Sequence, residues 1–81
     1  MNVYTIAEYT TGSEYLLTHE ESFSYLQVNL MCLSIEEELR KATPADEFAD
    51  PRRKLELIVN ELSKRHGFTK TGGVVVTINE P

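Results

Sequence analysis

The sequence predicts an α+β fold, in which two antiparallel helices pack on a small, mainly antiparallel sheet of two to three strands. Three observations predict it. Residues 51–66 form a well-capped amphipathic helix, a long segment with helical spacing precedes it at about residues 19–42, and β-branched runs stand at both ends of the chain. The 81 residues have room for one small globular domain, residues 1–81.

The helix at residues 51–66 has a start signal, an apolar face and a stop signal. Asp50 is a good N-cap, and Pro51 suits the first helical position because its missing N–H is not needed there. Gly67 can adopt the left-handed conformation that ends a helix. The apolar residues at spacing i, i+3, i+4 and i+7 are Leu55, Ile58, Val59 and Leu62.

The strands are expected at the two ends of the chain. Residues 3–9 have the composition of a strand, residues 10–13 that of a turn, and residues 14–17 that of a short returning strand, which together make an N-terminal hairpin. Residues 69–73 are expected to form a flexible turn, and residues 74–78 a C-terminal strand. We expect this last strand to pair with the N-terminal strand.

Residues 18–42 allow two interpretations. Thr18 and Glu21 fit a capping box, and Arg40 and Lys41 precede a proline, so one long helix at about residues 19–42 is the favoured interpretation.

The alternative is a third strand followed by a short helix. Ser34 and Glu37 form a second capping box, and apolar and polar residues alternate over residues 26–32 as they do in a strand. In that interpretation the helix covers only residues 35–42. The residues whose state differs most between the two interpretations are 23–33.

A long helix over this segment has two apolar sides. One stripe contains Phe23, Leu26, Leu30 and Leu33, and the other contains Val28, Met31, Ile35 and Leu39. A helix with two apolar sides needs a cover for each of them. The second helix and the sheet can cover one stripe, so the surplus is a homodimer seam or a binding surface, unless both stripes are core. We expect the protein to self-associate.

Charge is distributed unevenly along the chain. All eight Lys and Arg lie between Arg40 and Lys70, whereas residues 1–39 carry seven acidic residues and no basic one. This asymmetry indicates an acidic face that could meet a basic partner, or two halves that neutralise each other after folding. The candidate partner-binding acidic residues are Glu20, Glu21, Glu36, Glu37 and Glu38.

A basic cluster at residues 52–54 is the second candidate surface. Arg52, Arg53 and Lys54 stand in the first turn of a helix, where cations are mildly unfavourable, which hints at a use in binding phosphate or an acidic partner. Nearby acidic residues offset this cost. The alternative function is therefore a nucleic-acid-binding regulator, whose further basic residues would be Lys64, Arg65 and Lys70.

Several classes of site have no sequence signal. The single cysteine, Cys32, cannot form an internal disulfide, and its apolar surroundings favour an unreactive thiol. His19 and His66 lack metal-ligand spacing, and no phosphate-binding glycine loop or convergent catalytic set is present. No segment has the length and apolarity of a membrane span or the pattern of a signal peptide. We expect a cytoplasmic, non-enzymatic protein without a cofactor or metal.

The functional hypothesis is a small protein-binding module. It would act as an inhibitor, adaptor or regulator through an acidic and apolar surface, and its partner would carry a basic surface. By analogy with small phage-encoded inhibitors, the partner could be a host defence protein or a nucleic-acid-binding protein.

Overall fold

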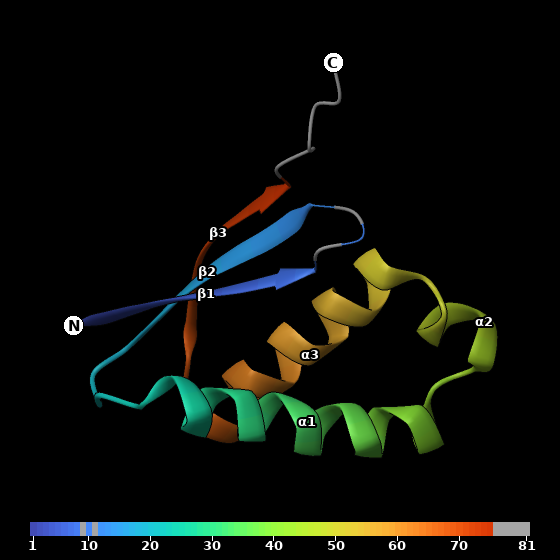
Figure 1. Cartoon of the computed structure of the whole chain (residues 1–81), viewed down its shortest axis with the longest axis horizontal. Helices are drawn as coiled ribbons and strands as arrows, with labels where there is room; N and C mark the ends of the chain where they lie inside the picture. Colours follow the sequence, from blue (N-terminus) through green and yellow to red (C-terminus); the bar gives the residue numbers. More distant parts are fainter. Residues whose placement is uncertain (9, 11, 76–81) are drawn as a thin grey trace.

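The computed structural model of the chain describes residues 1–8, 10 and 12–75, the last four of these by their backbone alone. It confirms the α+β fold: one antiparallel sheet with helices packed on one side of it (Figure 1). The elements in chain order are β1 (Asn2–Glu8), β2 (Ser13–His19), α1 (Tyr25–Ala42), α2 (Ala45–Phe48), α3 (Pro51–His66) and β3 (Thr69–Val75).

The sheet has the order β1-β2-β3, which corrects one predicted pairing. β1 and β2 form the expected hairpin, with Asn2 opposite His19 and Glu8 opposite Ser13. β3 pairs with β2 and not with β1, so the first and last strands are the two edges of the sheet. β3 also begins at Thr69, inside the segment expected to be a turn, because residues 69–73 have a partner strand in β2. Predicted strand residues 76–78, and Tyr9 in the first strand, lie outside the described residues.

Helix α1 begins later than predicted. Residues 18 and 19 belong to β2, and the helix starts at Tyr25 after Ser24. The Ser24 hydroxyl accepts the Gln27 N–H at 3.1 Å, and the Gln27 side chain accepts the Ser24 N–H at 2.7 Å, which is a complete capping box. Residues 26–32 are helical, so the alternative with a third strand in this segment is wrong.

Helix α3 has the predicted bounds and caps. The Asp50 carboxylate accepts the N–H of Arg52 at 3.1 Å, and Pro51 is the first helical residue. At the other end Gly67 has a φ of 76°, in the left-handed region. The connection between α1 and α3 contains the short helix α2, and α1 and α3 run in roughly opposite directions (Figure 1).

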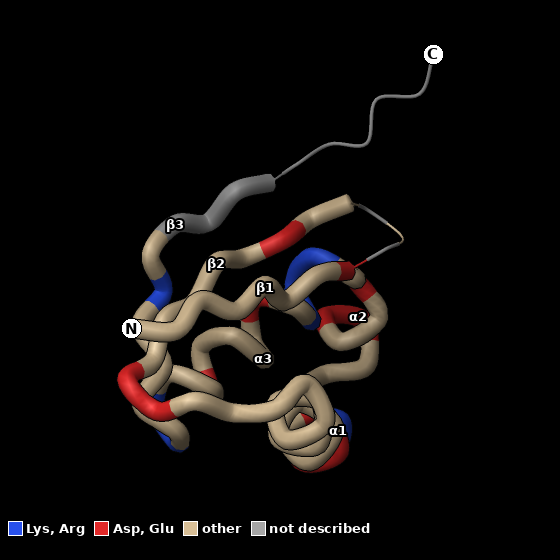
Figure 2. Tube along the Cα trace, turned by 60° about the vertical axis from the view of Figure 1, so that its left-hand side comes forward, with Lys and Arg blue, Asp and Glu red and all other residues tan. Residues whose placement is uncertain are grey.

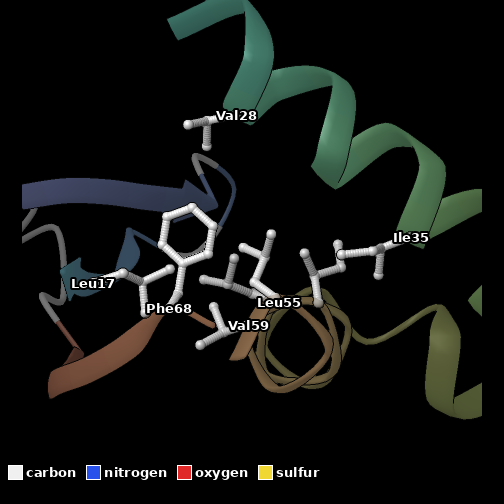
Figure 3. Packing of buried hydrophobic residues seen from close by; sticks show 8 residues of the cluster. Leu17, Val28, Ile35, Leu55, Val59 and Phe68 are labelled. Carbon is white, nitrogen blue, oxygen red and sulfur yellow. The ribbon is translucent and has the colours of Figure 1, made fainter. Parts of the chain in front are cut away.

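The core lies between the sheet, α1 and α3 (Figure 3). Leu17 of β2 and Leu62 of α3 are completely buried, and Phe68, which immediately precedes β3, is 3 % exposed. The predicted apolar stripe of α3 is buried throughout. Its four residues are Leu55, Ile58, Val59 and Leu62.

Candidate functional site

Helix α1 presents one of its two apolar sides to solvent. Val28 and Ile35 face the core, whereas the other side, which we call the leucine stripe, consists of Leu26, Leu30 and Leu33. These three leucines are 63, 55 and 54 % exposed. They share a face because residues separated by three or four positions lie above one another on a helix. The surplus apolar side expected from the sequence is therefore uncovered in the folded chain. Phe23 is not part of it, since it precedes the helix and packs against Tyr4 and Phe68.

A groove adjoins the leucine stripe. It runs between β1 and α1, has a volume of about 870 Å³, and is called here the β1–α1 groove. Val28, Leu55 and Ile58 are buried core residues that also line it. Tyr25 and Leu33 line it from α1, and both are largely exposed, so the groove and the leucine stripe form a continuous surface.

The groove exists because α1 packs against α3 and extends past the sheet. α3 contacts both edge strands, β1 and β3, and α1 in turn contacts α3. Figure 2 shows the resulting order, with the strands at the top, α3 beneath them and α1 farthest from β3. The far side of β1 therefore faces α1 across the groove.

The charged lining of the groove is mainly acidic. It contains the carboxylates of Glu8, Glu14 and Glu36 and one ammonium group, that of Lys54. Lys54 is 3.3 Å from Glu36, so this pair is largely neutral. Among the described residues, Glu8 and Glu14 form no ion pair. Glu8 accepts hydrogen bonds from the Thr10 side chain and from the Thr10 N–H, the latter at 2.6 Å, and these bonds hold the pKa of its carboxyl below the usual value.

Cys32 lines the same groove. Burial raises the pKa of its thiol, and the nearby Glu36 raises it further, because both disfavour the thiolate. The side chain is half-buried and packs against the core. A protonated thiol is a poor nucleophile, which agrees with the unreactive cysteine expected from the sequence.

The five predicted acidic residues do not form one free surface. Glu20 and Glu21 lie in the connection between β2 and α1, whereas the other three lie in the second half of α1. Glu36 pairs with Arg40 and Lys54 at 3.2 and 3.3 Å. The remaining pairs are Glu37 with Arg40 at 4.0 Å and Glu38 with Arg65 at 2.8 Å. Among the described residues, Glu20 and Glu21 make no ion pair.

The predicted basic cluster is also mostly paired. Arg53 contacts Glu47 at 3.2 Å and Glu56 at 2.5 Å, and these bonds raise the pKa of its guanidinium. Lys54 is held by Glu36, and it also lies over the Phe48 ring at 5.4 Å. Within the described part of the chain, only Arg52 of the three forms no ion pair.

The further basic residues have partners as well. Arg65 pairs with Glu61 as well as Glu38, Lys64 lies 3.8 Å from Glu61, and Lys70 lies over the Tyr15 ring at 5.2 Å.

The described residues contain no group of three or more His, Cys, Asp or Glu arranged to hold a metal. Over the same residues, no helix has the length and apolarity that a membrane crossing requires.

Comparisons with protein families, characterised proteins and solved structures give no significant match.

Two features of the folded chain are not predicted by the sequence. The β1–α1 groove depends on the placement of α1 relative to the sheet, which no local pattern encodes. The structural role of His19, whose ring packs against both Phe23 and Phe68, depends on contacts between distant segments. A signal for the groove was present in β1, whose residues 2–8 include no lysine, arginine or proline, the residues that usually protect a sheet edge.

Proposed function

We propose that the protein is a small, non-enzymatic protein-binding module that regulates its partner by occupying one of the partner's surfaces. The observation that carries this proposal is the leucine stripe, three exposed leucines on one face of α1, continuous with the β1–α1 groove. Exposed apolar patches of this kind mark interaction sites, because leaving them in water has a cost that a partner removes.

The chemistry of the groove supports binding over catalysis. Its lining holds one thiol, Cys32, whose raised pKa disfavours the nucleophilic thiolate, and it holds no histidine. Its ammonium group, on Lys54, is engaged by Glu36. A general acid or base needs a titratable group placed to act on a substrate, and these residues suit an apolar ligand with a polar end better.

The partner is another protein that combines apolar residues with a basic surface. Glu37 lies on the same face of α1 as the leucine stripe, and Glu8 and Glu14 border the groove, so the apolar surface is flanked by carboxylates. Such flanking charges contribute to association rate and to partner selection more than to affinity. An inhibitor or adaptor in the cytoplasm, including one of phage origin, could work in this way.

The alternative, a nucleic-acid-binding regulator, has less support from the geometry. Phosphate binding needs free cations, and two residues of the cluster at positions 52–54 are engaged by carboxylates of the same chain. We therefore expect no salt-dependent binding of a fluorescent oligonucleotide at low ionic strength. Binding that weakened steeply with salt and was lost in Arg52→Glu would favour the alternative.

The proposal is tested by affinity capture from a lysate of the cells that produce the protein, with and without nuclease. Three tagged forms are compared: the natural chain, Leu30→Glu and Asn60→Glu. Both substitutions place a carboxylate on an exposed helical position, but Leu30 lies on the leucine stripe of α1 and Asn60 lies on α3. We expect a stoichiometric partner that resists nuclease, is retained by Asn60→Glu and is reduced at least tenfold by Leu30→Glu. Equal capture by both variants, or capture that nuclease abolishes, would contradict the proposal.

A further inference from the structure

We propose that the β1–α1 groove binds an extended segment of the partner protein, which adds to the free edge of β1 as a fourth strand and carries alternating apolar side chains with a Lys or Arg near the β1–β2 turn. This inference rests on the proposed function and names the chemistry of the segment that the module binds.

The lining of the groove follows the edge of β1. Every residue from position 3 to position 8 lines it. Successive side chains of a strand point to opposite faces, so a cavity on one face would touch alternate residues only. Because this groove touches all six residues, it runs along the edge of β1, where the unpaired N–H and C=O groups lie. Six residues of strand extend over about 20 Å, which suits a bound segment of roughly the same length.

The two edges of the sheet differ in their protection against added strands. β3 carries Lys70 on its edge and has a register shift opposite Leu16 and Leu17, and both features discourage further pairing. β1 pairs with β2 in an uninterrupted register from Asn2 to Glu8 and has no basic residue or proline. An edge of this kind is a template for another strand, and β-strand addition is a common mode of peptide recognition.

The width of the helical layer leaves room for a fourth strand. Neighbouring strands lie about 4.8 Å apart and packed helices about 8–10 Å apart, so two helices can back about four strands. The sheet has three, and α1 lies beyond β1 rather than under the sheet (Figure 2). A strand added there would place its inward side chains over Val28, Leu55 and Ile58, which form the apolar floor of the groove.

Charge selects the polar part of the segment. The lining of the groove carries three carboxylates and one ammonium group, and the two carboxylates without an ion pair, those of Glu8 and Glu14, lie at the turn end of the β1–β2 hairpin. The hydrogen bonds from Thr10 keep Glu8 ionised to lower pH than usual. Glu8 shares the face of Tyr4 and Ile6, which pack against the core, whereas Glu14, opposite Ala7, lies on the other face. A Lys or Arg on the bound segment at this end would therefore meet one of the two carboxylates, whichever face it takes, and an acidic residue there would be repelled.

The first experiment selects peptides with the full chain as bait. A display library of random nine-residue peptides is enriched on the immobilised protein, and the winner is synthesised. We expect alternating apolar residues, rich in β-branched types, and a Lys or Arg near one end. Enrichment of acidic peptides, of peptides with helical apolar spacing, or of none would overturn the proposal.

Backbone methylation tests whether the peptide binds as a strand. Only alternate N–H groups of an added strand point to its neighbour. Two forms of the selected peptide are therefore made, N-methylated at the odd or the even positions. We expect one form to bind at least tenfold more weakly and the other to bind nearly unchanged. Equal affinities would exclude strand addition.

Cys32 provides a direct reporter of groove occupancy, because it is the only cysteine and lines the groove. Because the raised pKa of this thiol makes it slow to react, the alkylation is run at alkaline pH with excess iodoacetamide, and we expect a saturating amount of the selected peptide to slow it at least fivefold. An unchanged rate would place the peptide elsewhere. Protection that appears without peptide and rises with protein concentration would show a second copy in the groove and would also overturn the proposal.

A charge reversal with a matched control tests the polar end. We expect Glu14→Lys to weaken the peptide about tenfold and Glu20→Lys, which is outside the groove, to leave its affinity unchanged. Circular dichroism confirms that both variants are folded.

If a captured partner depends on Leu30 but leaves Cys32 reactive in the complex, the groove proposal fails while the proposed function stands. If the peptide protects Cys32 but Leu30→Glu captures the partner as well as the natural chain does, the proposed function fails while the groove proposal stands.

Discussion

His19 connects three parts of the chain at one end of the core. Its Nδ1 accepts the N–H of Glu21 at 2.9 Å, so a neutral ring carries its proton on Nε2, which then donates to the carbonyl oxygen of His66 at 2.6 Å. The ring also meets Phe23 and Phe68 edge-on, with centroids 4.9 Å apart in each case. His19, for which the sequence pattern predicts no role, therefore connects β2 to the end of α3.

The substitution His19→Ala tests this role. We expect it to lower the free energy of unfolding by about 1–2 kcal/mol, because it removes two hydrogen bonds and two ring contacts. Urea unfolding followed by circular dichroism measures the change. His66→Ala is the control, since His66 contributes its main-chain carbonyl to this contact. Similar losses in both variants would show that the ring of His19 is dispensable.

Protonation of Glu8 makes the stability of the fold depend on pH in the acidic range. A carboxyl whose pKa is lower in the folded than in the unfolded chain stabilises the fold while it is ionised. That contribution is present above its ordinary pKa of 4.5 and is lost as the pH falls through the lowered value. Glu8→Gln keeps an acceptor for the Thr10 N–H but does not titrate, so we expect unfolding midpoints of this variant to fall less steeply below pH 4.5 than those of the natural chain. The same pH dependence of the unfolding midpoint in both proteins would contradict this account.

At the scale of elements, the start of α1 shows what local sequence cannot decide. Thr18 with Glu21 and Ser24 with Gln27 both fit a capping pattern, six residues apart. The structure uses the second, because residues up to Thr18 pair with strands on both sides and His19 still pairs with β1. Tertiary pairing overrides a local helix signal when it satisfies the backbone of the same residues.

Ser24 and Ser34 provide a matched pair for this point, since Ser34 with Glu37 is a further capping pattern that lies inside the helix. We expect Ser24→Ala to destabilise the protein by about 1 kcal/mol through loss of the N-cap. Ser34→Ala should be neutral or slightly stabilising, because alanine is the better helix former. Thermal unfolding of the two variants measures both changes in stability. Equal changes in Ser24→Ala and Ser34→Ala would show that the Ser24 cap contributes nothing.

The two sides of α1 should respond differently to truncation. Ile35 is 1 % exposed and Leu33 is 54 % exposed. We expect Ile35→Ala to cost about 2–5 kcal/mol, because it opens a cavity, and Leu33→Ala to change stability by less than about 0.5 kcal/mol. Denaturant unfolding measures both. A large loss in Leu33→Ala would mean that the leucine stripe is covered.

The elements whose signals are local could be predicted from the sequence. The bounds of α3 follow from Asp50, Pro51 and Gly67, each of which acts on its own neighbours. The partner strand of β3 could not be predicted in this way, since its pairing with β2 joins residues such as Leu17 and Lys70 that are far apart in the chain. The leucines of the candidate site could be identified as a surplus stripe, but their exposure depends on where α1 packs.

At the scale of the whole molecule, folding brings the acidic and basic parts of the sequence together. Glu36 of α1 meets Lys54 of α3, and Glu38 meets Arg65. Such partly exposed pairs contribute little stability, but they pair three of the seven acidic residues of positions 1–39, all of them in α1, while the other four form no ion pair among the described residues. What distinguishes the surface of α1 is therefore its apolar stripe more than its charge.

The leucine stripe also predicts self-association. Two copies can cover each other's Leu26, Leu30 and Leu33, so the partner and a second copy would compete for the same residues. We expect light scattering to show a mass that rises from monomer toward dimer as concentration increases, and Leu30→Glu to remain monomeric. A monomer at the highest concentration reached would contradict the dimer.

The measurement that tests the central claim most directly is amide hydrogen exchange of the full chain, alone and bound to its captured partner. The account predicts slower exchange in the complex at residues 25–33 of α1 and at residues 3–8 of β1, with little change at the start of α3 around Arg52. Protection confined to the start of α3 would contradict the claim that the α1 side of the molecule is the binding surface.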